Sequence, residues 1–141
     1  DLHTAYRRQR QMCIRDSIDT LREICKPKAS FIACDDSPIQ WKEGKTFIFK
    51  MYLHGFLPVG RHTINVVKMD KTSREIDTKE YDNTVVIWNH YIKMEEISQQ
   101  VTRYTDTVDL YAGCLTSIAA WWTLKFYKHR QRKWQKIAKS L

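Results

Sequence analysis

The sequence predicts an α+β domain in which a curved antiparallel sheet wraps around one long C-terminal helix. Segments of alternating apolar and polar residues follow one another between residues 46 and 111, separated only by short turns. From residue 115 onward the alternation stops, and apolar residues recur at helical spacing. With 141 residues, 43% of them hydrophobic, the chain is long enough to bury one sizeable core. One helix must then cover the apolar face of the sheet.

The first predicted element is a short helix over residues 18–25. Ser17 can cap it, because a serine hydroxyl accepts a hydrogen bond from a free backbone N–H at a helix start. Asp19 is favourable in the first turn, and Pro27 ends the helix. Residues 30–34, SFIAC, then predict a short strand that is followed by a DDSP turn.

The main sheet is predicted from the alternating segments that follow. Residues 46–53, TFIFKMYL, place Phe47, Phe49 and Met51 on one face. We expect a broad turn over residues 54–60, because this stretch is rich in strand-breaking residues. The remaining strands are expected at 61–69, 74–81, 84–97 and 101–111. Strand 74–81 is polar and is expected to be solvated or at an edge, and the last two strands form a hairpin.

The long helix is expected to begin near Leu115 and to bury one stripe against the sheet. Its predicted buried residues are Leu115, Ile118, Ala119, Trp122, Phe126, His129 and Ile137. Its predicted solvent-facing residues are Lys125, Lys128, Arg132 and Lys136. One helix cannot fill a wide curved sheet, so we expect a cavity between the two.

The net charge of +8 is concentrated at the two ends of the chain. Residues 1–15 hold four arginines and one aspartate, and residues 115–141 hold seven basic residues and no acid. The intervening body holds thirteen basic and fifteen acidic residues. This distribution argues against a broad basic face for nucleic acid. The basic stretch at 126–136 leaves open binding to nucleic acid or to an anionic membrane surface, although a solvated helix end is the favoured interpretation.

The predicted hairpin contains the strongest candidate for chemistry. If residues whose numbers sum to 196 are paired, His90 faces Asp106, and both lie on the face that holds Trp88 and Tyr104. A buried carboxylate needs a partner, and an imidazole can supply it. The pair is either an acid/base dyad or a satisfied polar pair within a core. The second interpretation is favoured because structural ion pairs are common, and a His–Asp pair without a nucleophile or metal is a weak sign of catalysis.

The cysteines and the remaining histidines predict no metal site and no cofactor. Four cysteines are present without a CxxC pair, which favours a reducing cytoplasm over a disulfide framework. The remaining histidines of the folded body, at positions 54, 62 and 129, lack the spacing of metal ligands. No apolar run approaches the roughly 18 residues of a membrane span, so no stable membrane insertion is expected.

Several motifs resemble the START-like, helix-grip superfamily, also called SRPBCC or polyketide cyclase/dehydrase. The motifs are W-x-E-G at 41–44, P-V-G-R-H-T-I at 58–64, W-N-H at 88–90, T-D-T-V-D-L-Y-A-G at 105–113 and F-Y-K-H-R-Q-R-K-W at 126–134. The resemblance covers about residues 17–141. It implies a helix-grip fold with a ligand cavity, and inward-facing positions for His90, Asp106 and Arg130. Members of the superfamily include carriers, receptors and cyclases, so the resemblance alone selects no activity.

The front of the chain departs from that pattern. Members usually begin with a strand, but residues 1–15 show no convincing alternation, and RQMCIRDS resembles a translated sequencing adaptor. We therefore expect residues 1–15 to be a non-native, disordered or helical arm, residues 16–141 to be the ligand-binding domain, and the first strand to be missing.

The function predicted from these observations is the binding of a small, largely apolar ligand in the cytoplasm, without nucleic acid as a partner. The expected ligand-binding residues are Phe47, Phe49, Met51, Trp88, His90, Tyr104, Asp106, Trp122 and Arg130. The alternatives are a cyclase or dehydratase that uses His90 and Asp106 as catalytic groups, or surface binding through the basic C-terminal helix.

Overall fold

The computed structural model describes residues 18–34, 40–99 and 101–140. The predicted arm at 1–15 and the predicted cap Ser17 lie outside these residues. The described elements are α2 (Ile18–Cys25), β1 (Ala29–Ala33), β2 (Thr46–Leu53), β3 (Leu57–Asp70), β4 (Glu75–Tyr81), β5 (Ile87–Ser98), β6 (Val101–Tyr111), a 3₁₀ turn (Gly113–Leu115) and α3 (Thr116–Ser140). The α+β class is therefore confirmed.

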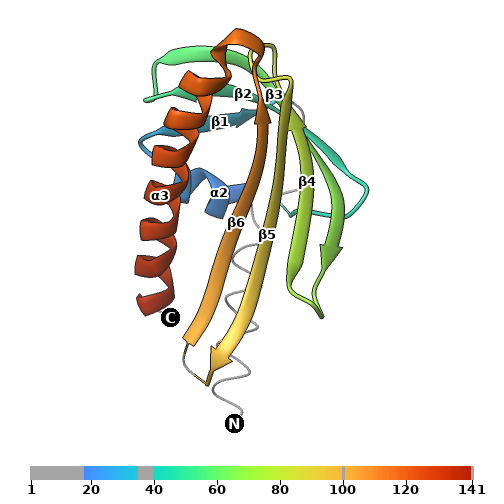
Figure 1. Ribbon diagram of the computed structural model, residues 1–141, viewed down its shortest axis with the longest axis vertical. Helices are drawn as coiled ribbons and strands as arrows, with labels where there is room; N and C mark the ends of the chain where they lie inside the picture. Colours follow the sequence, from blue (N-terminus) through green and yellow to red (C-terminus); the bar gives the residue numbers. More distant parts are fainter. Residues whose placement is uncertain (1–17, 35–39, 100, 141) are drawn as a thin grey trace.

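The six strands form one open antiparallel sheet in the order β1-β2-β3-β4-β5-β6. This order confirms the predicted meander, in which each strand pairs with its neighbour in sequence. The sheet is strongly bent, since β1 and β2 cross the upper part of the molecule while β5 and β6 run along its long axis (Figure 1). α3 lies across the concave side, and α2 contacts both α3 and β1.

Two sequence expectations about the strands are wrong in detail. β3 begins at Leu57, inside the stretch that was expected to be a turn, because a register shift at Met51/Tyr52 lets Pro58 and Gly60 lie within a paired strand. In the β5–β6 hairpin the predicted register is wrong by two residues. His90 lies opposite Val108, and Ile92 lies opposite Asp106. A shift of two residues preserves the side-chain alternation, so the predicted shared face survives.

The buried stripe of α3 also differs from the prediction. Leu115 and Ile118 are 45% and 67% exposed, whereas Thr123, Tyr127 and Arg130 are buried. The cause is that α3 has two apolar faces, and the one that packs on the sheet also contains polar residues, which an apolar count overlooks. The prediction for Phe126, which is buried, is confirmed. The four basic residues predicted to face solvent, Lys125, Lys128, Arg132 and Lys136, are all exposed.

The core lies between α2, the first three strands and the middle of α3. Its largest fully buried side chains are Ile24, Cys25, Phe47 and Phe49. Aromatic edge contacts tie the core together, with Trp41 on Phe47 at 4.7 Å between ring centroids and Phe31 on Phe49 at 5.9 Å. These aromatic contacts hold the packed core in place, and the candidate site lies next to it.

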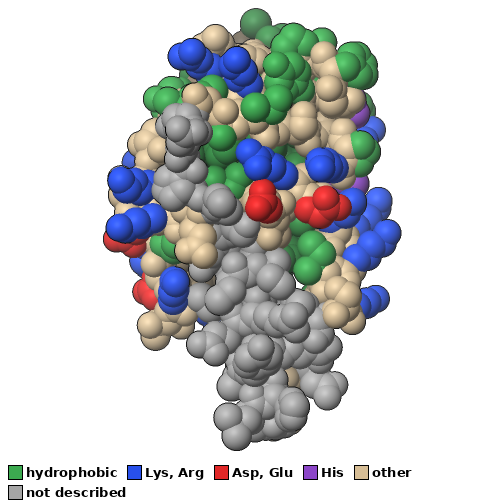
Figure 2. All heavy atoms as spheres, turned by 180° about the vertical axis from the view of Figure 1, so that it is seen from behind, with side chains coloured by type: hydrophobic (Ala, Val, Ile, Leu, Met, Phe, Trp, Pro, Cys, Tyr) green, Lys and Arg blue, Asp and Glu red, His purple; other side chains and the backbone are tan. Residues whose placement is uncertain are grey.

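On the face turned away from the viewer in Figure 1, the lysine and arginine side chains of the described residues are dispersed among other residues (Figure 2). Among the described residues, no helix has both the length and the apolar composition of a membrane span.

Candidate functional site

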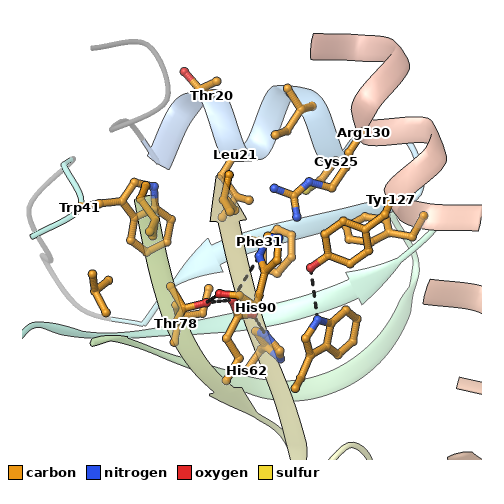
Figure 3. Close-up of a pocket in the computed structure, with 18 of the residues that line it drawn as sticks. Thr20, Leu21, Cys25, Phe31, Trp41, His62, Thr78, His90, Tyr127 and Arg130 are labelled. Atoms are coloured by element: carbon orange, nitrogen blue, oxygen red, sulfur yellow. Dashed lines mark hydrogen bonds and ion pairs between the residues drawn. The ribbon is translucent and has the colours of Figure 1, made fainter. Parts of the chain in front are cut away.

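A cavity lies between the concave face of the sheet, α2 and α3 (Figure 3). Its volume is about 70 Å³, counted as the space open to the centre of a water-sized sphere. A single water needs roughly 10–15 Å³ on this measure, so the cavity has room for several waters or a small ligand. It is lined by Thr20, Leu21, Ile24, Cys25, Phe31, Trp41, Met51, His62, Ile64, Val66, Ile76, Thr78, Glu80, Trp88, His90, Ile92, Tyr104, Phe126, Tyr127, Arg130 and Trp134.

Five of the nine residues predicted to bind ligand line this cavity: Met51, Trp88, His90, Tyr104 and Arg130. Phe47 and Phe49 do not, because they are fully packed in the core at 1% and 0% exposure. Trp122 does not line it either, since its ring stacks on Phe126 at 4.9 Å. Asp106 is not among the lining residues and lies behind His90.

The predicted contact between His90 and Asp106 is confirmed. His90 Nε2 lies 2.7 Å from Asp106 Oδ1, and the two side chains are 5% and 3% exposed. The two residues are diagonal neighbours in the hairpin, not the directly opposed pair that was expected. Asp106 also accepts hydrogen bonds from the Tyr104 hydroxyl at 3.0 Å and from Gln131 Nε2 at 3.1 Å. Its role toward a ligand stays a prediction.

The environment keeps Asp106 ionised. Burial would raise the pKa of its carboxyl, but the hydrogen bond with His90 and the positive charge of Arg130 outweigh burial and lower the pKa. The carboxylate is therefore a fixed negative charge that orients the His90 ring at the cavity wall.

A second imidazole–carboxylate cluster, which the sequence analysis missed, adjoins this pair. His62 on β3 lies 2.9 Å from Glu80 Oε2 through Nε2 and 3.2 Å from Asp82 Oδ2 through Nδ1. Glu80 Oε1 accepts from the Thr78 hydroxyl at 2.6 Å and lies 3.9 Å from His90 Nδ1. Glu80 thus links the two histidines, and the polar side chains form one continuous series across the sheet.

This second cluster is strongly charged. Burial disfavours the charged imidazole of His62, but hydrogen bonds to Asp82 and Glu80 outweigh it and raise the pKa to about 9. Burial would raise the pKa of Glu80 and Asp82, but it is outweighed and both are lowered. His62 lowers both, helped at Asp82 by backbone N–H groups of Val85 and Thr84 and at Glu80 by His90 and Thr78. At neutral pH His62 is therefore an imidazolium held between two carboxylates.

A sequence signal for this cluster did exist. His62 has the same alternation as Ile64 and Val66, and Glu80 has the same alternation as Ile76 and Thr78, so each falls on the buried face of its strand. β4 was expected to be solvated or at an edge because its composition is polar, but it lies between β3 and β5. In fact Thr78 is buried and Glu80 is largely covered, with a side chain that is 10% exposed.

Arg130 extends from α3 into the cavity (Figure 3). It is 6% exposed, and its guanidinium carbon lies 4.8 Å from the Tyr127 ring centroid and 5.7 Å from that of Phe126. The Tyr127 hydroxyl accepts a hydrogen bond from Trp88 Nε1 at 3.2 Å, which connects helix and sheet. Stacking on fixed aromatic rings gives the guanidinium a defined position.

The site therefore combines an apolar lining with a polar wall. The polar wall comes from β3 to β6 and from Arg130, and the rest of the lining is mostly aliphatic and aromatic. This composition suits a small molecule with an apolar body and a polar end. Among the described residues, no cluster of His, Cys, Asp and Glu has the arrangement needed to hold a metal ion.

Comparison with protein-family models, with curated proteins and with solved structures finds no match for this chain.

Proposed function

We propose that the protein is a helix-grip protein of the START-like type that binds a small, largely apolar ligand in the cavity between its sheet and α3. The observation that supports this most directly is the space itself, because about 70 Å³ is left between a curved sheet and one helix. Protein interiors are otherwise close-packed, and voids larger than a water molecule are few. The cavity is lined mainly by apolar side chains, which a ligand of the same character would cover.

The test is a titration with a neutral, apolar fluorescent probe, N-phenyl-1-naphthylamine. We expect saturable binding to the wild type. Val66→Phe should weaken binding at least tenfold, because Val66 lines the cavity and a larger ring would occupy the ligand's space. Val67→Phe is the matched control, since Val67 is the next residue on β3, is 47% exposed and does not line the cavity.

Two results would contradict this proposal. One is the absence of probe binding to folded wild-type protein. The other is equal loss of binding in Val66→Phe and Val67→Phe, which would place the probe outside the cavity. Circular dichroism of each variant verifies that the fold is retained.

A second candidate function is a cyclase or dehydratase that uses His90 as a general acid or base. It is favoured by one observation, the 2.7 Å contact that orients His90 through Asp106 at the wall of the cavity. A carboxylate that orients an imidazole is a recurrent arrangement in acid–base catalysis. The two candidates differ in the fate of the ligand. Mass spectrometry of the co-purified molecule after incubation detects an unchanged ligand for a carrier and a chemically altered one for an enzyme, and His90→Asn should abolish only the alteration.

A further inference from the structure

Two hydrogen-bond donors in the cavity wall have no partner. Of the buried side-chain polar atoms in the described part of the chain, three lack a hydrogen bond: Thr123 Oγ1, Arg130 Nε and Trp134 Nε1. The last two belong to residues that line the cavity, and both are N–H donors. They lie four residues apart on α3, so they are neighbours on one face of the helix.

Leaving such groups without a partner is unfavourable. A buried donor without an acceptor costs about 1–3 kcal/mol, and a buried charge without a close partner costs more. Among the described residues, no carboxylate forms an ion pair with Arg130. A ligand that supplied an acceptor would remove this cost.

Glu80 in the polar wall and Asp106 behind it are already bonded to other donors. Asp106 accepts from His90, Tyr104 and Gln131, and Glu80 accepts from Thr78 and contacts His62. Asp106 interacts with the Arg130 charge, which lowers the pKa of its carboxyl, but Arg130 Nε stays without an acceptor. Both carboxylates come from the sheet, and the one imidazolium there, His62, is already held between Glu80 and Asp82. An incoming anion is therefore favoured at the α3 side, next to the guanidinium.

We propose that the ligand carries an anionic oxygen headgroup, a carboxylate or a phosphate, which accepts hydrogen bonds from Arg130 and Trp134 while its apolar body fills the rest of the cavity. This rests on the proposed ligand-binding function and adds the chemical class of the ligand. The planar guanidinium matches such oxyanions because it offers its donors in a fixed fork. The stacked rings of Tyr127 and Phe126 hold that fork in place before the ligand arrives.

The test compares three ligands with the same six-carbon chain: hexanoate, hexyl phosphate and hexan-1-ol. Binding is followed by intrinsic fluorescence, because three tryptophans line the cavity. In the wild type at pH 7 we expect at least one of the two anions to bind ten or more times tighter than the alcohol. The tighter of the two identifies the headgroup.

Variants of Arg130 and Trp134 test whether the donors of these two residues cause the preference for the anion over the alcohol. Arg130→Gln should reduce the preference for the anion to less than threefold, whereas Arg132→Gln, which removes an exposed arginine from the same helix, should leave it unchanged. Trp134→Phe removes the N–H but keeps an aromatic ring, and it should reduce the preference several-fold. Trp121→Phe is its control, because Trp121 is 59% exposed.

The proposal is overturned if the wild type binds the alcohol as tightly as both anions, a result that does not depend on whether any variant folds. It is also overturned if folded Arg130→Gln keeps the preference. In either case, tight binding of hexan-1-ol would leave the proposed ligand-binding function standing. If none of the three ligands and no neutral probe binds, the ligand-binding function itself is wrong.

Discussion

The buried charge of Asp106 is compensated by several hydrogen bonds from different parts of the chain. Its carboxylate receives three hydrogen bonds, from a histidine, a tyrosine and a glutamine on two strands and one helix. His62 shows the reverse arrangement, with one imidazole held between two carboxylates. In both cases the charged form is stable only because every partner is present, so the loss of one partner leaves the others uncompensated.

Replacing Asp106 by alanine should therefore lower the free energy of unfolding by about 3 kcal/mol or more. The measurement is urea denaturation at pH 7. Asp109→Ala is the control, because Asp109 lies on the same strand and is exposed, so its loss should be within about 0.5 kcal/mol. Equal effects of the two substitutions would show that Asp106 is not a buried, bonded group.

The raised pKa of His62 predicts a loss of stability in alkaline solution. An imidazole whose pKa is about 6.5 in the unfolded chain and about 9 in the folded protein binds a proton more tightly when folded, so its contribution is complete below pH 6.5 and is lost as pH rises through 9. The size of the loss is about 3 kcal/mol. It is measured as the free energy of unfolding between pH 6 and pH 10.

His62→Gln should remove most of this pH dependence, and His54→Gln should not, because His54 is exposed. A wild-type stability that stays constant between pH 6.5 and pH 9 would contradict the charge assignment of the cluster. On the acid side, the lowered pKa of Glu80 and Asp82 means that their contribution is lost as pH falls through their folded values.

At the scale of elements, α3 has two apolar faces, one of which is buried and the other exposed. One face, with Phe126 and Tyr127, packs on the sheet and borders the cavity. The other, with Ile118, Trp121 and Leu124, is 58–67% exposed, and Lys125 lies 3.8 Å above the Trp121 ring. The basic character of the helix is divided in the same way, since Arg130 points inward while Lys128 and Arg132 face solvent.

The difference in burial between the two faces predicts that truncating two side chains on α3, only two residues apart, will lower the free energy of unfolding by very different amounts. Phe126→Ala should lower the free energy of unfolding by about 3–5 kcal/mol, because its ring is 3% exposed and its removal leaves a cavity. Leu124→Ala should change it by about 0.5 kcal/mol or less, since Leu124 is 58% exposed. Urea denaturation of the two variants checks this, and a large cost at Leu124 would show that its face is covered by another part of the protein.

At the scale of the whole molecule, the bent sheet and the long helix enclose a cavity and do not pack together completely. The wall of the cavity comes from α2, α3 and all strands from β1 to β6. A ligand bound there is enclosed by residues from the helices and from the sheet. Binding of a ligand in the cavity should therefore stabilise the whole fold and not one helix or strand alone.

A bound ligand at 100 times its dissociation constant stabilises the folded state by about 2.7 kcal/mol. For a domain of this size we expect the melting temperature to rise by roughly 10 °C. Differential scanning calorimetry with and without the neutral probe measures the shift. Val66→Phe should show almost none of it, and a similar rise in that variant would mean that the probe stabilises the protein from outside the cavity.

The sequence by itself determined the element order, the meander and the shared face of His90 and Asp106. These features depend on local periodicity, because alternation and helical spacing are properties of neighbouring residues. It did not determine the register of the β5–β6 hairpin, since a slip of two residues keeps every side chain on the same face.

Only the tertiary structure decided which of the two apolar faces of α3 is buried and which polar residues meet in the cavity. His62, Glu80 and His90 come from three strands, and their joining depends on cross-strand pairing that no local pattern encodes. The position of Phe47 and Phe49 in the packed core, and not at the cavity, was likewise decided by where the rings of Trp41 and Phe31 lie against them. Burial is a property of the assembled layers, and polar residues such as Glu80 and Arg130 enter a core only when distant partners or a ligand site are in place.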